Sequence, residues 1–218
     1  MITWALQNYF QKVYKLLEIG VGTAFVLSGI ESISHDLQLF GSDIIEGLFY
    51  AAGRLNRAEL FQMDARRIPF ENEFDVIGAF DVIEHIEEDG IVLSQMFKAT
   101  CPGGGIILTV PQHKFLWSTV DEYARHVRRY SARELKIKCE QAGFKVIRTT
   151  SFVSFLFPAM ALSSLRKKKS VNNIMAEFCI IRKLNSLFKW VFNVERRFIR
   201  MGFSFPFGGS LLIIARKN

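Results

Sequence analysis

The sequence predicts an α/β protein built on an open, mostly parallel sheet with helices on both faces. Short apolar runs alternate with segments that are apolar at helical spacing, which is the pattern of repeated strand–helix units. The first apolar run, 16–19, ends in Gly20 and Gly22, a pair typical of a sharp turn from a strand into a helix. Right-handed crossovers between such units bring the carboxyl ends of the strands, where ligands bind, to one edge of the sheet.

Each further element has its own local signal. Glycines 103–105 predict a turn into the strand that follows them. Ser131 with Glu134 predicts a capping box at the start of a helix that ends at Gly143. The apolar segment 152–162 is too short to span a bilayer, and we expect a buried strand end or the wall of a binding pocket. The expected strands are 16–19, 37–42, 59–63, 74–80, 106–111 and one from about 144, and the expected helices are 25–33, 45–54, 91–99 and 131–143.

Four acidic residues, Glu18, Asp43, Asp64 and Asp81, lie at or just beyond the ends of predicted strands. Asp43 follows Gly22 by about 20 residues, the spacing at which an acid binds ribose hydroxyls in nucleotide sites. Glu18 stands directly before the glycines, where it favours a cationic group over a pyrophosphate. Any one of these acids could simply stabilise a helix N-terminus. Four at equivalent positions of successive units predict a nucleoside site.

The segment 17–24, Leu-Glu-Ile-Gly-Val-Gly-Thr-Ala, resembles the first motif of the class I S-adenosylmethionine-dependent methyltransferases, Glu-x-Gly-x-Gly-x-Gly, with Ala24 replacing the last glycine. Later segments are similar to that family's motifs in the same order, and the resemblance covers 16–154. It implies S-adenosylmethionine as the cofactor. It also implies a Rossmann-like methyltransferase fold with seven strands, the last of them antiparallel beside the fifth and preceded by a helical insertion. The later matching segments are Asp43, 63–70, 74–86 and 102–111.

The resemblance also assigns roles to the candidate cofactor residues. Asp43 would bind the ribose hydroxyls, and Asp64 with Ala65 would contact the adenine. The residues assigned to the methionine end of the cofactor are Glu18, Gly20, Gly22, Phe80 and Asp81.

The connector 111–131 is dense in His, Arg, Asp and aromatic residues, which predicts a substrate site at the ligand edge of the sheet. It resembles the Pro-x-x-x-x-Leu-Trp-Ser and Asp-x-x-x-x-His-x-Arg-Arg-Tyr patterns of a methyltransferase subgroup that acts on small molecules. The alternative is structural: the arginines would pair with acids, and the aromatic residues would pack. The predicted substrate residues are Trp117, Asp121, His126 and Arg129.

A general base is needed if the methyl acceptor is a hydroxyl or amine that must lose a proton. Histidine is the natural candidate because its ordinary pKa lies near neutrality. The predicted catalytic residues are His85, His113 and His126. For His85 the alternative remains that it only bonds to the backbone at a helix start.

One domain, 1–218, is expected from the chain length of 218 residues. We divide it into a cofactor-binding core at 15–154, a basic amphipathic insertion at 155–206 and the last strand at 207–218. The formal net charge is +7, and the excess is concentrated after residue 165. The segment 166–200 reads as a basic amphipathic helix, which either packs on the core with a solvated basic face or lies on an anionic membrane surface.

The remaining features limit compartment and partners. No signal peptide or membrane span is evident, so we expect a cytoplasmic protein with contact to a membrane left open. The three cysteines have no disulfide or metal-ligand spacing, and we expect no metal site. Nucleic acid is not an expected partner because no recognition motif is evident. The sequence does not predict the oligomeric state.

The expected function is methyl transfer from S-adenosylmethionine to a small-molecule or lipid-like acceptor. Two alternatives remain open. Ala24 and the short segment before the first strand would also suit a cofactor-binding protein or scaffold without catalysis. The glycine turn followed by an acid would also suit an NAD-dependent dehydrogenase.

Overall fold

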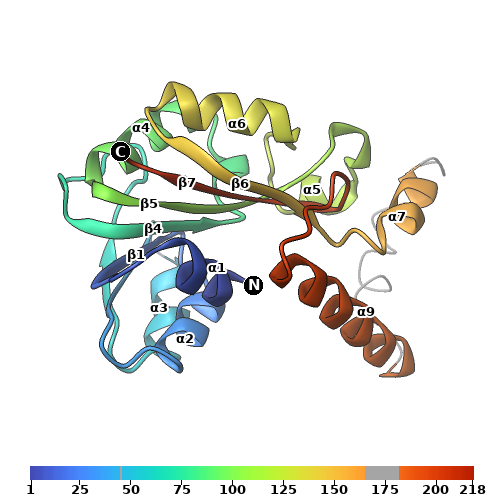
Figure 1. The fold of residues 1–218 in the computed structure, drawn as a ribbon, viewed down its shortest axis with the longest axis horizontal. Helices are drawn as coiled ribbons and strands as arrows, with labels where there is room; N and C mark the ends of the chain where they lie inside the picture. Colours follow the sequence, from blue (N-terminus) through green and yellow to red (C-terminus); the bar gives the residue numbers. More distant parts are fainter. Residues whose placement is uncertain (45, 165–181) are drawn as a thin grey trace.

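The sheet of the computed structural model has seven strands in the order β3-β2-β1-β4-β5-β7-β6. The structure describes residues 1–44, 46–164 and 182–218. Strands β1 to β5 are parallel, and β7 runs antiparallel between β5 and β6 (Figure 1), which confirms the predicted fold class. The strands are Lys15–Ile19 (β1), Gln38–Asp43 (β2), Glu59–Gln62 (β3), Phe74–Phe80 (β4), Thr100–Pro111 (β5), Lys145–Phe152 (β6) and Ser210–Arg216 (β7).

Helices cover both faces of the sheet: α1, α2 and α3 lie on one side, and α4 and α6 lie on the other (Figure 1). Successive side chains of one strand therefore pack in two different hydrophobic clusters, one on each face of the sheet. Leu16 packs in the cluster under α1 and α2, whereas Leu17 packs in the cluster under α4 and α6. The helices are Ile2–Tyr9 (α1), Phe25–Glu31 (α2), Glu46–Ala52 (α3), Ile83–His85 (η1), Asp89–Ala99 (α4), Lys114–Leu116 (η2), Thr119–Tyr123 (α5), Ala132–Gln141 (α6), Phe157–Ser164 (α7) and Arg182–Arg200 (α9).

Glycines 103–105 lie inside β5, so their prediction as a turn before the strand was wrong. They mark a place where two backbones approach closely. A Cβ atom on Gly104 would lie 2.3 Å from the carbonyl oxygen of Asp75, and one on Gly105 would lie 2.1 Å from that of Ala215. The pairing register between β4 and β5 shifts between Phe74 and Val76, beside these glycines.

The segment after β6 forms helix α7 rather than a strand end, which corrects the prediction for 152–162. Only Phe152 belongs to the strand. Pro158 is the second residue of α7, where a proline is tolerated because the first turn of a helix needs no N–H donor. Leu162 is exposed, so the apolar composition of this segment reflects a surface helix.

The predicted capping at Ser131 is confirmed, since its hydroxyl oxygen accepts a hydrogen bond from the backbone N–H of Glu134 at 3.1 Å. Part of the predicted basic helix is present as α9. Its first part, 166–181, lies outside the described residues, as does Ile45 at the predicted start of α3. Within the described part of the chain, no helix is both long and apolar enough to cross a bilayer.

Candidate functional site

A cleft of about 700 Å³ opens at the carboxyl edge of the parallel strands. It brings together most of the predicted cofactor residues: Gly20, Asp43, Asp64, Ala65 and Asp81 all line it, as does His85. These residues follow the ends of four strands, β1 to β4. The convergence arises because parallel strands all end at the same edge of the sheet. The other lining residues are Ile19, Ile44, Met63, Arg66, Val82, Ile86, Glu87, Glu88 and Val127.

The bend after β1 requires unusual backbone angles. Gly20 and Gly22 have φ values of +66° and +50°, and Ala24, at the position of the family's third glycine, has φ +57°. This left-handed conformation is readily adopted by glycine and costs other residues roughly 1–2 kcal/mol. A Cβ atom on Gly20 would also lie 2.5 Å from a methyl group of Val82. The bend therefore depends on Gly20 for both its angle and its space.

Asp43, at the end of β2, fixes the glycine bend and borders the cleft. Its Oδ2 accepts a hydrogen bond from the N–H of Gly22 at 2.8 Å, and its Oδ1 accepts one from the N–H of Ile44 at 2.7 Å. Carboxylate oxygens have two lone pairs each, so both retain capacity to accept from ligand hydroxyls. The position suits the predicted contact with a ribose.

Asp64 lies beyond β3 in an apolar corner of the cleft. Met63 and Ala65 on either side of it are buried. Arg66 donates from Nη2 to Oδ2 of Asp64 at 2.8 Å, and this hydrogen bond lowers the pKa of Asp64. The guanidinium also reaches Glu88 across the cleft at 3.4 Å. Apolar side chains beside a hydrogen-bonding carboxylate are compatible with a purine base.

Three predicted cofactor residues do not line the cleft. Gly22 and Phe80 lie beside it, and Phe80 packs against the core under α1 and α2. Glu18 is 3% exposed and lies behind the bend, where the N–H of Leu27 donates to its carboxylate. Burial raises the pKa of Glu18 to about 8. Direct contact of these residues with a cofactor stays a prediction.

Asp81 begins the loop after β4 with φ +54°, and its N–H donates to the carbonyl oxygen of Thr109 at 2.9 Å. This strained conformation turns the residue into the cleft. The carboxyl is accessible from the cleft but surrounded by protein on its other sides, so desolvation raises its pKa. Two smaller effects lower the pKa of Asp81: a hydrogen bond with Thr109 and the charge of the neighbouring His126.

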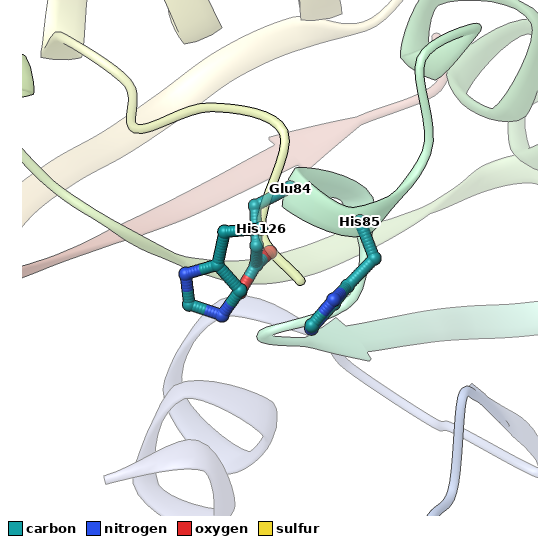
Figure 2. Close-up of side chains that lie close together, drawn as sticks. All are labelled: Glu84, His85 and His126. Atoms are coloured by element: carbon teal, nitrogen blue, oxygen red, sulfur yellow. The ribbon is translucent and has the colours of Figure 1, made fainter. Parts of the chain in front are cut away.

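Beside Asp81, η1 and the loop after α5 bring Glu84, His85 and His126 together (Figure 2). The rings of the two histidines are 4.7 Å apart between centroids, and His126 Nε2 lies 4.0 Å from Glu84 Oε1. Glu84 is fully buried, and burial followed by the charge of Asp81 raises its pKa to about 8. Burial and His126 lower the pKa of His85. Sequence reasoning named both histidines but not Glu84.

The predicted substrate residues Asp121, His126 and Arg129 form one buried network. Asp121 accepts from Arg129 Nε at 2.8 Å and Nη2 at 3.0 Å, and its Oδ1 lies 2.9 Å from His126 Nδ1. Burial acts against ionisation, but the hydrogen bonds from Arg129 and His126 prevail and lower the pKa of Asp121. Asp121 also caps α5 together with Ser118. Because these groups bind one another, they position the loop, and a direct contact with substrate stays a prediction.

Two other predicted residues lie outside the lining of the cleft. Trp117 is half-buried after η2. His113 packs among Phe115, Phe157 and Phe207, with ring centroids 5.2–6.0 Å away. Burial, with the charge of Arg129, lowers the pKa of His113. The structure therefore does not bring His113 to His85 and His126, because the chain turns away after β5.

Comparison with known proteins agrees with the predicted family and fold. A family model described as a methyltransferase domain matches residues 5–149. A curated relative, the biotin biosynthesis bifunctional protein BioHC of Teredinibacter turnerae, is 27% identical over 176 residues, which are 72% of this chain and 31% of that protein. The chain thus spans about a third of the length of that relative.

Solved structures share the fold at low sequence identity. An S-adenosylmethionine-dependent methyltransferase from Mesorhizobium loti superposes with a TM-score of 0.62 at 14% identity, over 97% of this chain and 95% of that one. Phosphoethanolamine N-methyltransferase 2 of Haemonchus contortus, in complex with S-adenosyl-L-methionine, gives 0.63 at 19% identity, over 99% of this chain and 52% of that one. Because the family model matches more than half of the chain, the protein belongs to the methyltransferase domain family, as its sequence predicts, and it shares the fold of S-adenosylmethionine-dependent methyltransferases.

Proposed function

We propose that the cleft binds S-adenosylmethionine and that the methyl group passes to a small-molecule or lipid-like acceptor held beside His85. The observation that carries the proposal is the order of groups along the cleft. Asp64 and Ala65 line the part of the cleft that follows β3. Asp43 and Gly20 line the middle part, at the ends of β2 and β1. Asp81 and His85 line the part that follows β4. This order matches adenine, ribose and methionine, and it leaves the reactive sulfonium nearest to Asp81.

The chemistry requires little from the protein beyond alignment. The nucleophilic atom of the acceptor forms a bond to the methyl carbon while the carbon–sulfur bond breaks, and the sulfonium becomes a neutral thioether. Holding the two reactants in line can supply about 7–11 kcal/mol of the barrier reduction. In this proposal His85 contacts the acceptor directly because it lines the cleft, and His126 acts from behind it. The position of His113 does not support a role as the general base, because His113 does not line the cleft.

Binding of the product S-adenosylhomocysteine, measured by calorimetry, tests the cofactor site. Asp43→Asn should weaken binding by about 10-fold or more, because hydrogen bonds to a charged group contribute about 1.5–3 kcal/mol. Asp36→Asn is the matched control, since Asp36 is exposed and outside the cleft. Equal affinity of the two variants would contradict the proposal. Binding of NADH in place of S-adenosylhomocysteine would select the dehydrogenase alternative. Cofactor binding without turnover of any acceptor would leave the scaffold alternative.

The proposal also includes a cytoplasmic enzyme that touches an anionic membrane through 166–200. Within the described part, α9 is held at its inner face by Glu195, whose carboxylate accepts from the N–H groups of Ser154 and Phe155 at 2.8 and 3.1 Å. Its outer surface combines aromatic and basic residues, the composition of an interfacial helix. Exposed residues of α9 are Lys189, Trp190, Phe192, Arg196, Arg197, Phe198 and Arg200, and Met201 and Phe203 follow in the turn after it.

Vesicle sedimentation tests the membrane contact. Binding to vesicles that contain phosphatidylserine, but not to pure phosphatidylcholine, is expected, and it should weaken in high salt. Replacing Arg197 and Arg200 with Glu should reduce the bound fraction several-fold, whereas Arg133→Glu on α6 should not. Equal binding to both vesicle types would contradict the proposed anionic preference, and absence of binding would leave α9 as a core-packed helix with a solvated face.

A further inference from the structure

The donor atoms of Glu84, His85 and His126 face one another at the edge of the cleft. One atom of each side chain lies within 4.8 Å of the corresponding atoms of the other two. Glu84 and His85 come from the same short helix, η1, and His126 reaches them from the loop after α5 (Figure 2). We refer to these three residues as the Glu–His–His cluster. Its burial is graded, from fully buried Glu84 through half-buried His126 to exposed His85.

The carboxylate of the cluster has no compensating group. Both oxygens of Glu84 are buried and have no hydrogen-bond partner among the described residues. The closest approach of His126 Nε2, 4.0 Å, is too long for a hydrogen bond. Arg129 is near enough to influence Glu84, but its guanidinium donates to Asp121 and to the carbonyl oxygen of Gln112. A buried carboxyl group without a hydrogen-bond partner is costly, and a bound cation would supply the missing partner.

A second carboxyl group lies on the same side of the cleft. Asp81 comes two residues before η1 and lines the cleft together with His85. Two carboxyl groups facing one space repel each other unless one is protonated or a cation lies between them. This side of the cleft thus combines two carboxyl groups with two imidazole donors.

His126 is oriented as histidine ligands are in metal sites. Metal-binding histidines usually donate their other ring N–H to a carboxylate or a backbone carbonyl. Asp121 Oδ1 lies 2.9 Å from His126 Nδ1, and Asp121 is an ionised acceptor held by Arg129. A proton on Nδ1 leaves the lone pair of Nε2 directed toward Glu84.

We propose that the Glu–His–His cluster binds one divalent transition-metal ion, with its open coordination positions toward the cleft. Two imidazoles and one carboxylate suit Zn²⁺, Fe²⁺, Co²⁺ or Mn²⁺. Bonds of about 2.0–2.2 Å in a tetrahedron separate neighbouring donors by roughly 3.4 Å, so rotations that move the donors by about an ångström close the site. This proposal departs from the sequence expectation of no metal site, which rested on cysteine spacing alone.

The ion would also define the acceptor, and this part rests on the proposed function. An oxygen acceptor, a hydroxyl or phenol, would take an open coordination position beside Asp81. Coordination lowers the pKa of the bound oxygen, as a metal does for bound water. The hydroxyl proton leaves to solvent through the cleft. The oxygen then forms the bond to the methyl carbon while the carbon–sulfur bond breaks. His85 and His126 are ligands in this scheme rather than bases.

Metal titration of the full chain tests the site without knowledge of the acceptor. The protein is treated with a chelator, dialysed and titrated with Zn²⁺ by calorimetry, and Co²⁺ absorption spectra report the donor set. One ion per chain is expected. His85→Ala should weaken binding at least about 10-fold, and Asp121→Asn should weaken it about 10- to 100-fold by loss of the supporting hydrogen bond. His35→Ala is the control because His35 is an exposed histidine outside the cluster.

The variants separate the possible failures. Glu84→Gln removes the central ligand, and since Glu84 is buried, its folding is checked by circular dichroism. His85 is exposed, so His85→Ala provides a decisive test even if Glu84→Gln does not fold. Absence of stoichiometric binding, or equal binding by His85→Ala and His35→Ala, would overturn the metal site. S-adenosylhomocysteine binding is measured on the same samples. If the parent protein binds S-adenosylhomocysteine but not Zn²⁺, only the metal proposal fails. If the parent protein does not bind S-adenosylhomocysteine, the proposed function itself fails.

Discussion

The buried acid behind the glycine bend should make the protein less stable as pH rises. Glu18 has its pKa raised from 4.5 to about 8 by burial, so the folded chain holds this proton more tightly than the unfolded chain. Its contribution to stability is fully present below the unfolded pKa and is lost as pH rises toward 8. Glu18→Gln keeps the shape of the protonated acid and removes the titration. The variant should therefore gain free energy of unfolding relative to the parent as pH increases.

The size of the effect follows from the two pKa values. One pKa unit corresponds to about 1.4 kcal/mol, and the difference between variant and parent changes over the interval between the unfolded and folded values. Between about pH 5.5 and 7.5 the difference should change by about 2 kcal/mol in favour of Glu18→Gln. The other titrating groups are common to both proteins and cancel in the difference.

Urea unfolding at several pH values in this window, without cofactor, measures the change. Glu87→Gln is the control for loss of a carboxylate, because Glu87 is exposed. The control should give a difference from the parent that stays flat with pH. A flat difference for Glu18→Gln as well would refute the argument, since it would mean that Glu18 titrates alike in the folded and unfolded chains.

Three further perturbations have expected sizes. Gly20→Ala should cost about 2–4 kcal/mol of stability and abolish S-adenosylhomocysteine binding, because backbone strain and a steric clash combine. Gly22→Ala should cost only about 1–2 kcal/mol, because it introduces backbone strain alone. Equal losses of stability in the two variants would contradict this reasoning. Asp121→Ala should cost about 3–5 kcal/mol by leaving Arg129 unpaired, and the double variant with Arg129→Leu should lose less than the sum; additive losses in urea unfolding would exclude the coupling. Ser131→Ala should cost about 1 kcal/mol through its lost cap, and an unchanged midpoint would exclude that role.

The fold could be predicted from the sequence because each strand–helix unit has a local sequence pattern. Acids such as Asp43 and Asp64 were found for the same reason: the end of a predicted strand fixes the edge of the sheet to which its next residue belongs. The two element errors were also local. The apolar segment before Leu162 has no strong period, and glycines 103–105 look like a turn unless the partner strand is known.

The Glu–His–His cluster was beyond sequence reasoning because it depends on a tertiary contact. Glu84 and His126 are joined only when the loop after α5 folds back over η1. The N–H of Val127 donates to the carbonyl oxygen of Glu84 at 2.8 Å, and this bond fixes the return of the loop. Glu84 itself gave a weak signal, because it is one of several acids that follow the predicted strand 74–80. The pairing of Asp121 with Arg129 was anticipated only as the structural alternative.

The position of β7 has a consequence for biosynthesis. Strand β6 joins the sheet only through β7, and β7 is the partner of the otherwise open side of β5. As the ribosome extends the chain, β5 keeps an unsatisfied row of backbone groups until residues 210–216 emerge. Residues 112–209 must be made before that gap is closed, and such distant pairing is slow. The nascent chain thus carries an exposed strand edge from the completion of β5 until β7 is made, and in this state chaperone capture or wrong pairing with another chain competes with completion of the sheet.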